Sequence, residues 1–120
     1  MDSEALIIRT LPGTPEGQGV LCLQGPLTMD NVSQFQSAIR REDASKMIVD
    51  LSEVPYIDSA GLGSIVTAYV SLQKEGRWMA LVGVNERVSR LFEITHVQDL
   101  FLTFPSLWDA VNALGNAADA

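Results

Sequence analysis

A serine stands at the start of the clearest helical pattern in the sequence, where its hydroxyl could take either of two roles. Ser59 follows Asp58 and precedes Ala60, Gly61 and Gly63. The first amides of a helix have no partners within the helix and favour negative charge. Asp58 or Ser59 could cap the helix, which stabilises it by about 1 kcal/mol. Alternatively, Ser59 could accept a phosphate, which adds about −1.5 to −2 charges at neutral pH.

The two glycines after this serine need an explanation of their own. Glycine early in a helix costs up to about 1 kcal/mol relative to alanine. Gly61 and Gly63 could allow the helix to pack closely against the sheet. They could also leave a bare surface around Ser59 on which a partner docks. The two interpretations are compatible.

The sequence lacks the groups of residues that catalysis or metal binding requires. Ser59 is not in a Gly-x-Ser-x-Gly elbow, and His96 and Cys22 are the only residues of their types. Cys22 lies in an apolar run and is predicted to be a buried, inert thiol. Gly61-Leu62-Gly63 resembles a dinucleotide fingerprint, but Val66 occupies the third glycine position. We therefore expect no enzymatic activity, no catalytic, metal-binding or cofactor-binding residues, and no cofactor.

Length and charge exclude several function classes. The chain has 120 residues and a formal net charge of −7, which predicts one domain over 1–120. Nucleic acids are bound by clustered Lys and Arg, whereas Arg40-Arg41 is followed at once by Glu42-Asp43. No stretch approaches the roughly 18 apolar residues of a membrane span, and Met1–Glu4 lacks a secretion signal. We expect a cytoplasmic protein with neither nucleic acid nor membrane as a partner.

Hydrophobic periodicity predicts strands that alternate with helices. We expect strands over 5–9, 20–24, 47–51, 78–82 and 101–104, and helices over 28–41, over 59–75, after Asn85 and from Pro105–Ser106 onward. Such alternation is typical of crossover units in a parallel sheet. The predicted fold class is α/β, with a mostly parallel four- to five-stranded sheet, an antiparallel first strand and about four helices. The core is expected over about 5–114, with a flexible tail over 115–120.

Several side chains have expected roles within these elements. Thr28 is expected to cap the first helix, with Met29 on the apolar face of that helix. Ser106 and Asp109 have the spacing of a capping box, with Asp in place of Glu. Trp78 could be a surface anchor, but aromatic residues of strands usually lie in the core, so a core position is predicted.

Several sequence runs carry a resemblance to a known family. Ile48-Val49-Asp50-Leu51 and Tyr56-Ile57-Asp58-Ser59-Ala60-Gly61-Leu62-Gly63 are similar to the core signature of STAS domains. Leu81-Val82-Gly83-Val84-Asn85 and Leu91-Phe92-Glu93-Ile94-Thr95 agree with later parts of that pattern. The resemblance runs from about Val20 to Ala110 and is closest to the anti-sigma factor antagonists.

The resemblance implies a compact α/β domain that regulates transcription indirectly. An unphosphorylated antagonist of this family binds an anti-sigma factor and so frees the sigma factor. The anti-sigma factor is also a serine kinase, and the acceptor position of the family falls on Ser59. A phosphoserine phosphatase reverses the modification. ATP belongs to the kinase, so no cofactor is implied for this chain.

The sequence departs from the family pattern at two places. Ala60 stands where the family often has a second Ser or Thr, and Gly25-Pro26-Leu27-Thr28 stands where it usually has Gly-Glu-(Leu/Ile)-Asp. We expect a partner-binding surface made by Thr28, Asp58, Ser59, Ala60, Gly61 and Gly63. The two missing carboxylates favour an alternative function. In that alternative, the chain is a phosphorylation-independent STAS scaffold subunit of a transport or signalling complex.

Overall fold

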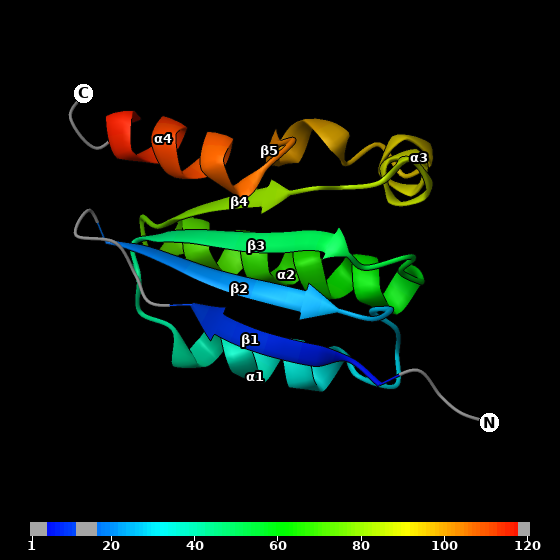
Figure 1. The fold of residues 1–120 in the computed structure, drawn as a ribbon. Helices are drawn as coiled ribbons and strands as arrows, with labels where there is room; N and C mark the ends of the chain where they lie inside the picture. The colour runs from blue at the N-terminus through cyan, green and yellow to red at the C-terminus, as the bar shows by residue number, and fades with distance from the viewer. Residues whose placement is uncertain (1–4, 12–16, 118–120) are drawn as a thin grey trace.

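The computed structural model describes residues 5–11 and 17–117, which form a five-stranded sheet and its helices (Figure 1). The strands are β1 (Ile7–Leu11), β2 (Gln18–Gln24), β3 (Lys46–Glu53), β4 (Trp78–Val82) and β5 (Leu102–Phe104). The helices are α1 (Val32–Arg41), α2 (Ser59–Lys74), α3 (Glu86–Ile94) and α4 (Leu107–Ala117), with a short 3-10 turn η1 (Gln98–Leu100) before β5.

The sheet has the strand order β1-β2-β3-β4-β5. β1 pairs with β2 in the antiparallel direction, and every later pair is parallel. The predicted fold class is therefore confirmed. In this topology the carboxyl ends of β2, β3 and β4 meet at one edge of the sheet, which is the edge where α/β domains usually place their functional loops.

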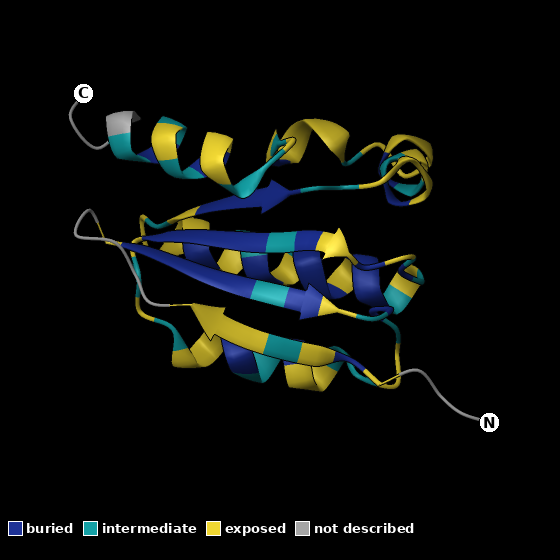
Figure 2. Cartoon of the chain, viewed as in Figure 1, coloured by how far each residue is buried: buried dark blue, intermediate teal, exposed yellow. Residues whose placement is uncertain are grey.

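The helices cover both faces of the sheet and make two separate cores. Alternate strand residues point to opposite faces, so Leu21, Val49 and Leu81 pack with α1, α2 and α3. Val20 and Ile48 belong to the smaller core, which also contains residues of α4. Figure 2 shows the resulting pattern, with β2, β3 and β4 mostly dark blue between the helices and the outer strand β1 mostly yellow.

Two buried polar side chains hold α4 on its face of the sheet. The Lys46 ammonium donates to the Leu114 carbonyl at 2.8 Å, and the Gln18 side-chain amide donates to the Val111 carbonyl at 2.9 Å. A positive charge near the end of a helix is favourable because the last carbonyls lack partners there. The helix continues to Ala117; the flexible tail expected over 115–120 stays a prediction, and residues 118–120 lie outside the described part of the chain. Before α4, the Asp109 amide donates to the Ser106 hydroxyl at 3.1 Å, as the predicted capping box requires, whereas the Asp109 carboxylate accepts from the Ser106 hydroxyl at 2.8 Å and not from its backbone amide.

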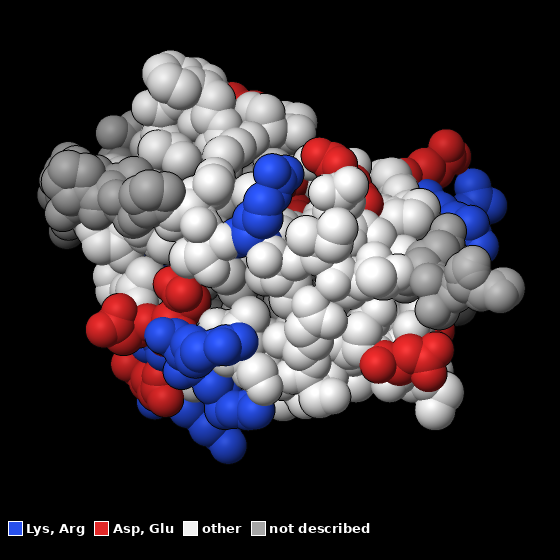
Figure 3. Space-filling model, turned by 60° about the horizontal axis from the view of Figure 1, so that its bottom comes forward, with Lys and Arg blue, Asp and Glu red and all other residues white. Residues whose placement is uncertain are grey.

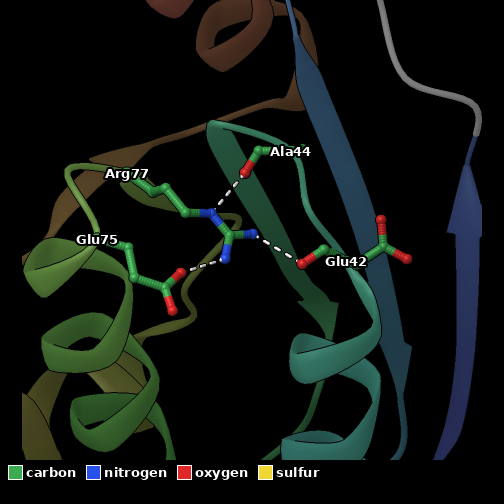
Figure 4. Close-up of polar contacts among 4 residues, drawn as sticks. All are labelled: Glu42, Ala44, Glu75 and Arg77. Atoms are coloured by element: carbon green, nitrogen blue, oxygen red, sulfur yellow. Dashed lines mark hydrogen bonds and ion pairs between the residues drawn. The ribbon is translucent and has the colours of Figure 1, made fainter.

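Arg77 joins segments at the edge where the parallel strands β3 and β4 begin (Figure 4). Its Nε donates to the Ala44 carbonyl at 2.9 Å and its Nη2 to the Glu42 carbonyl at 2.8 Å. Its Nη1 pairs with the Glu75 carboxylate at 2.7 Å. One guanidinium thus joins the end of α1 to the turn between α2 and β4.

Two side chains are more exposed than predicted. Trp78 was predicted to lie in the core, but it is 48% exposed, because β5 pairs only with 80–82 and leaves the start of β4 without a second neighbour. Cys22 is half-buried, and its Sγ lies 4.0 Å from the Asp50 carboxylate. Burial, and next the negative charge of Asp50, raise the pKa of the Cys22 thiol, which favours the inert thiol form.

Candidate functional site

Two loops meet at the carboxyl edge of the sheet and form one unit. They are the β2–α1 loop (25–31) and the β3–α2 loop (54–58). Leu27 and Ile57 make an isolated parallel bridge between them. The Leu27 amide donates to the Tyr56 carbonyl at 3.3 Å, and the Asp58 amide donates to the Leu27 carbonyl at 3.2 Å. The start of α2 is therefore held directly against the β2–α1 loop.

Asp58 is the cap of α2, and both of its carboxylate oxygens are engaged. Oδ1 accepts from the Gly61 amide at 2.8 Å, and Oδ2 accepts from the Met29 amide at 3.1 Å. One side chain thus satisfies a free amide of the helix and fixes the neighbouring loop. Of the two residues that could have capped the helix, Asp58 does so.

Ser59 is the first residue of α2, and its side chain is exposed. Its hydroxyl has no hydrogen-bond partner within the part of the chain that the structure describes. Because Asp58 supplies the cap, the Ser59 hydroxyl is not needed to hold the helix. It is available for chemistry at the surface.

The two glycines of the motif have different environments. Gly61 is buried, and a Cβ there would overlap with the carbonyl oxygen of Leu27 and lie 3.0 Å from its carbon. Gly61 therefore lets α2 pack directly against the β2–α1 loop. Gly63 is exposed, and a Cβ there would meet nothing within 4 Å. Close packing is thus observed at Gly61 and an open surface at Gly63; that a partner docks on this surface stays a prediction.

The exposed side of α2 carries no charge over most of its length. Ser59, Gly63, Thr67 and Val70 are exposed and follow one another at helical spacing, so they share one face. No Asp, Glu, Lys or Arg occurs between Ser59 and Gln73. Ala60 lies at the margin of this face and is half-buried. We call these four exposed residues the α2 face.

The expected cap of α1 is wrong. The helix begins at Val32, and Asn31 rather than Thr28 precedes it. The Asn31 side chain accepts from the Thr28 amide at 2.9 Å and donates to the Pro26 carbonyl at 3.0 Å. These bonds close the loop on itself, so Thr28 stays in the loop, half-buried, and accepts from the Asp30 amide at 3.3 Å.

Met29 is a candidate that sequence reasoning missed, because it was assigned to the apolar face of the first helix. The later start of α1 places Met29 in the loop, where its side chain is 73% exposed. It lines a surface hollow of about 610 Å³ together with Thr28, Asp58 and Tyr56. Thus the hollow joins both loops and borders the start of α2.

The described residues contain no group of three His, Cys, Asp or Glu that could hold a metal ion. Among the same residues, no helix is long and apolar enough to cross a membrane.

Comparisons with known proteins agree with this geometry. A family model described as "STAS domain" matches residues 7–110. An anti-sigma-B factor antagonist from Staphylococcus aureus (strain NCTC 8325 / PS 47) is 33% identical over 73 residues, which cover 61% of this chain and 68% of the relative.

Solved structures share the fold. An anti-sigma factor antagonist from Mycobacterium paratuberculosis superposes with a TM-score of 0.79 at 23% identity, covering 91% of this chain and 93% of that one. The Bacillus cell fate determinant SpoIIAA in its phosphorylated form gives a TM-score of 0.69 at 16% identity, covering 90% and 99%. The matched family, the sheet order and the loop that carries Asp58 and Ser59 lead to one conclusion: this chain belongs to the STAS domain family.

Proposed function

We propose that this chain is an anti-sigma factor antagonist, a binding protein rather than an enzyme, and that phosphorylation of Ser59 switches it off. Its partner in this proposal is an anti-sigma factor with serine kinase activity, and binding that partner regulates transcription indirectly. The similarity to the Staphylococcus aureus anti-sigma-B factor antagonist supports the class of protein.

The observation that carries the proposal is the exposed Ser59 at the head of the uncharged α2 face. An uncharged helix face with a bare glycine can be covered by a partner without burying a charge. A phosphate placed within such an interface would bring up to two negative charges under the partner, and the uncharged α2 face does not neutralise them, which costs several kcal/mol. One modification would therefore change the affinity by orders of magnitude.

The domain is built to tolerate this modification. Asp58 accepts hydrogen bonds from the first turn of α2 and from the neighbouring loop. The Ser59 hydroxyl takes part in neither bond, so a phosphate on Ser59 leaves both in place. The kinase would transfer the γ-phosphoryl group of ATP to the Ser59 Oγ, with loss of the hydroxyl proton and release of ADP. A phosphatase would hydrolyse the ester, which restores serine and releases inorganic phosphate.

The partner surface in this proposal combines the two loops and the helix. Ser59 and Gly63 supply exposed contact area, while Thr28, Asp58 and Ala60 lie half-buried at its margin. Gly61 is buried and acts by letting α2 approach Leu27. Exposed Met29 extends the surface beyond the residues identified in the sequence.

The alternative function, a scaffold subunit that is not phosphorylated, has one observation in its favour. The loop position where the family usually has Glu is taken by Pro26, which is buried, so this loop lacks the usual carboxylates. A scaffold would bind its partner with equal affinity whatever the charge at Ser59.

Affinity capture from the native cells separates the two functions. Immobilised Ser59→Ala and Ser59→Asp proteins are compared for the anti-sigma factor that they retain, identified by mass spectrometry. Ser71→Asp is the matched control, because it adds the same charge to an exposed position farther along α2. We expect retention by Ser59→Ala and Ser71→Asp and a loss of at least tenfold with Ser59→Asp. Equal retention of an anti-sigma factor by all three proteins would refute the switch.

Peptide mapping of the protein isolated from those cells tests the modification itself. We expect a phosphate on the peptide that contains Asp58–Gly63. An unmodified Ser59 under every growth condition would favour the scaffold.

A further inference from the structure

The positive charges of this chain are distributed unevenly between the two edges of the sheet. Five of the eight Lys and Arg residues lie at the start of β3, at the ends of α1 and α2 or in the turn after α2: Lys46, Arg40, Arg41, Lys74 and Arg77. Arg9 lies in the middle of β1, opposite Cys22 of β2. The remaining two are Arg87 and Arg90 on α3. Figure 3 shows blue side chains gathered mainly at the lower left of that view, with a separate one near the upper middle and a smaller group at the right.

The helix that carries these two arginines is attached to the loop that leads to Ser59. α3 begins directly after the carboxyl end of β4, and its cap is Asn85. The Asn85 side chain donates to the Val54 and Pro55 carbonyls, each at 3.1 Å. The first turn of α3 therefore keeps a constant position relative to the β3–α2 loop.

Arg87 lies over the loop itself. Its guanidinium carbon is 4.9 Å from the centre of the Tyr56 ring, which is a cation–π contact. Tyr56 and Asp58 line the same hollow, so both face one side of the loop. Tyr56 is three positions before Ser59 in the sequence, so their Cα atoms are at most about 10 Å apart.

The other charged groups at this edge are negative, except for Arg90. Among the residues that the structure describes, they are Asp30, Glu53, Asp58 and Glu86. Arg90 is paired with Glu86 at 3.4 Å. Arg87 pairs with no carboxylate among the described residues. It is the cation at this edge that a new anion could recruit without breaking an ion pair.

We propose that Arg87 is the internal counter-ion of phosphorylated Ser59. The guanidinium leaves the Tyr56 ring and donates to the phosphate oxygens, because a charged, bidentate hydrogen bond is stronger than an exposed cation–π contact. This inference rests on the phosphorylation of Ser59 proposed above. It adds that the phosphate on Ser59 is bound by a side chain of α3. While Ser59 is unmodified, Arg87 remains in its cation–π contact with the Tyr56 ring.

The test is a titration of the phosphate in the full chain, with phosphoserine placed at position 59 during translation so that no kinase is needed. Phosphorus NMR measures the second pKa of the phosphate in the parent protein, in Arg87→Gln and in Arg90→Gln. Arg90 is the matched control, because it lies one turn farther along the same exposed helix. We expect Arg87→Gln to raise the phosphate pKa by about 0.3–0.7 units and Arg90→Gln to raise it by less than half as much.

A second readout follows the Tyr56 ring. Its proton signals should shift on phosphorylation in the parent protein and should not shift in Arg87→Gln. An unchanged phosphate pKa in Arg87→Gln, or equal effects of the two variants, would overturn the counter-ion role. Neither result depends on a kinase or on the partner, so the proposed switch can fail or stand independently of this titration.

Discussion

Replacing each glycine of the Ser59 motif by alanine should have opposite effects on stability. At Gly61, the added Cβ would overlap with the Leu27 carbonyl oxygen and lie 3.2 Å from the Ile57 Cβ. Backbone cannot move aside as a flexible side chain does, and overpacking of this kind costs about 1–3 kcal/mol. The gain in helix propensity returns up to about 1 kcal/mol, so Gly61→Ala should destabilise the domain by about 1–2 kcal/mol.

Gly63→Ala makes the same chemical change two residues later, where the Cβ meets nothing within 4 Å. Only the propensity gain remains, so this variant should be more stable than the parent by about 0.5–1 kcal/mol. Together the two variants should differ by about 1.5–3 kcal/mol. Urea unfolding followed by circular dichroism measures this difference as a separation of midpoints at constant slope.

The difference in free energy of unfolding between Gly61→Ala and Gly63→Ala tests whether close packing at Gly61 constrains the protein. If Gly61→Ala were as stable as Gly63→Ala, the close approach of α2 to the β2–α1 loop would not constrain the protein. If both variants were destabilised equally, the steric difference between the two positions would not decide stability, which contradicts the open space around Gly63 and the absence of a positive φ at either glycine.

Two further predictions concern parts of the fold away from this motif. Arg77→Lys should lower the free energy of unfolding by about 1–2 kcal/mol, because an ammonium cannot reach the Glu42 and Ala44 carbonyls and the Glu75 carboxylate together. Urea unfolding measures this free energy, and Lys74→Arg is the control at an exposed position. Equal stability of the two variants would contradict the role of the Arg77 guanidinium in joining these three groups. Burial raises the pKa of the Cys22 thiol, so at pH 8 iodoacetamide should modify the folded chain several-fold more slowly than the urea-unfolded chain. Equal rates would contradict that shift.

The succession of elements could be predicted because the signals for it are local. The apolar runs of β2, β3 and β4 and the spacing of Leu62, Ile65 and Leu72 in α2 are properties of short windows. Alternation of strands and helices then restricts the topology to a mainly parallel sheet. The predicted and observed bounds differ by a few residues because the ends of elements depend on loop contacts.

The start of α1 shows where local reasoning failed. Thr28 is a good capping residue, and Met29 continues the apolar spacing of the helix. The loop closes instead through the bonds of Asn31 to Thr28 and Pro26, and through the bond of Met29 to the Asp58 side chain. The last of these partners lies far away in the sequence, so no short window could reveal that Met29 would be exposed.

The sequence by itself determined the α/β fold class, the position of the Asp58-Ser59 motif at the head of α2 and the resemblance to the STAS family, because these depend on residue order and periodicity. Only the tertiary structure decided that Asp58 is the cap, that the Ser59 hydroxyl has no hydrogen-bond partner among the described residues, and that Arg87 lies over the Tyr56 ring. The physical reason is that each of these facts depends on which loops meet at the carboxyl edge of the sheet. That meeting is set by pairing between strands that are distant in the chain.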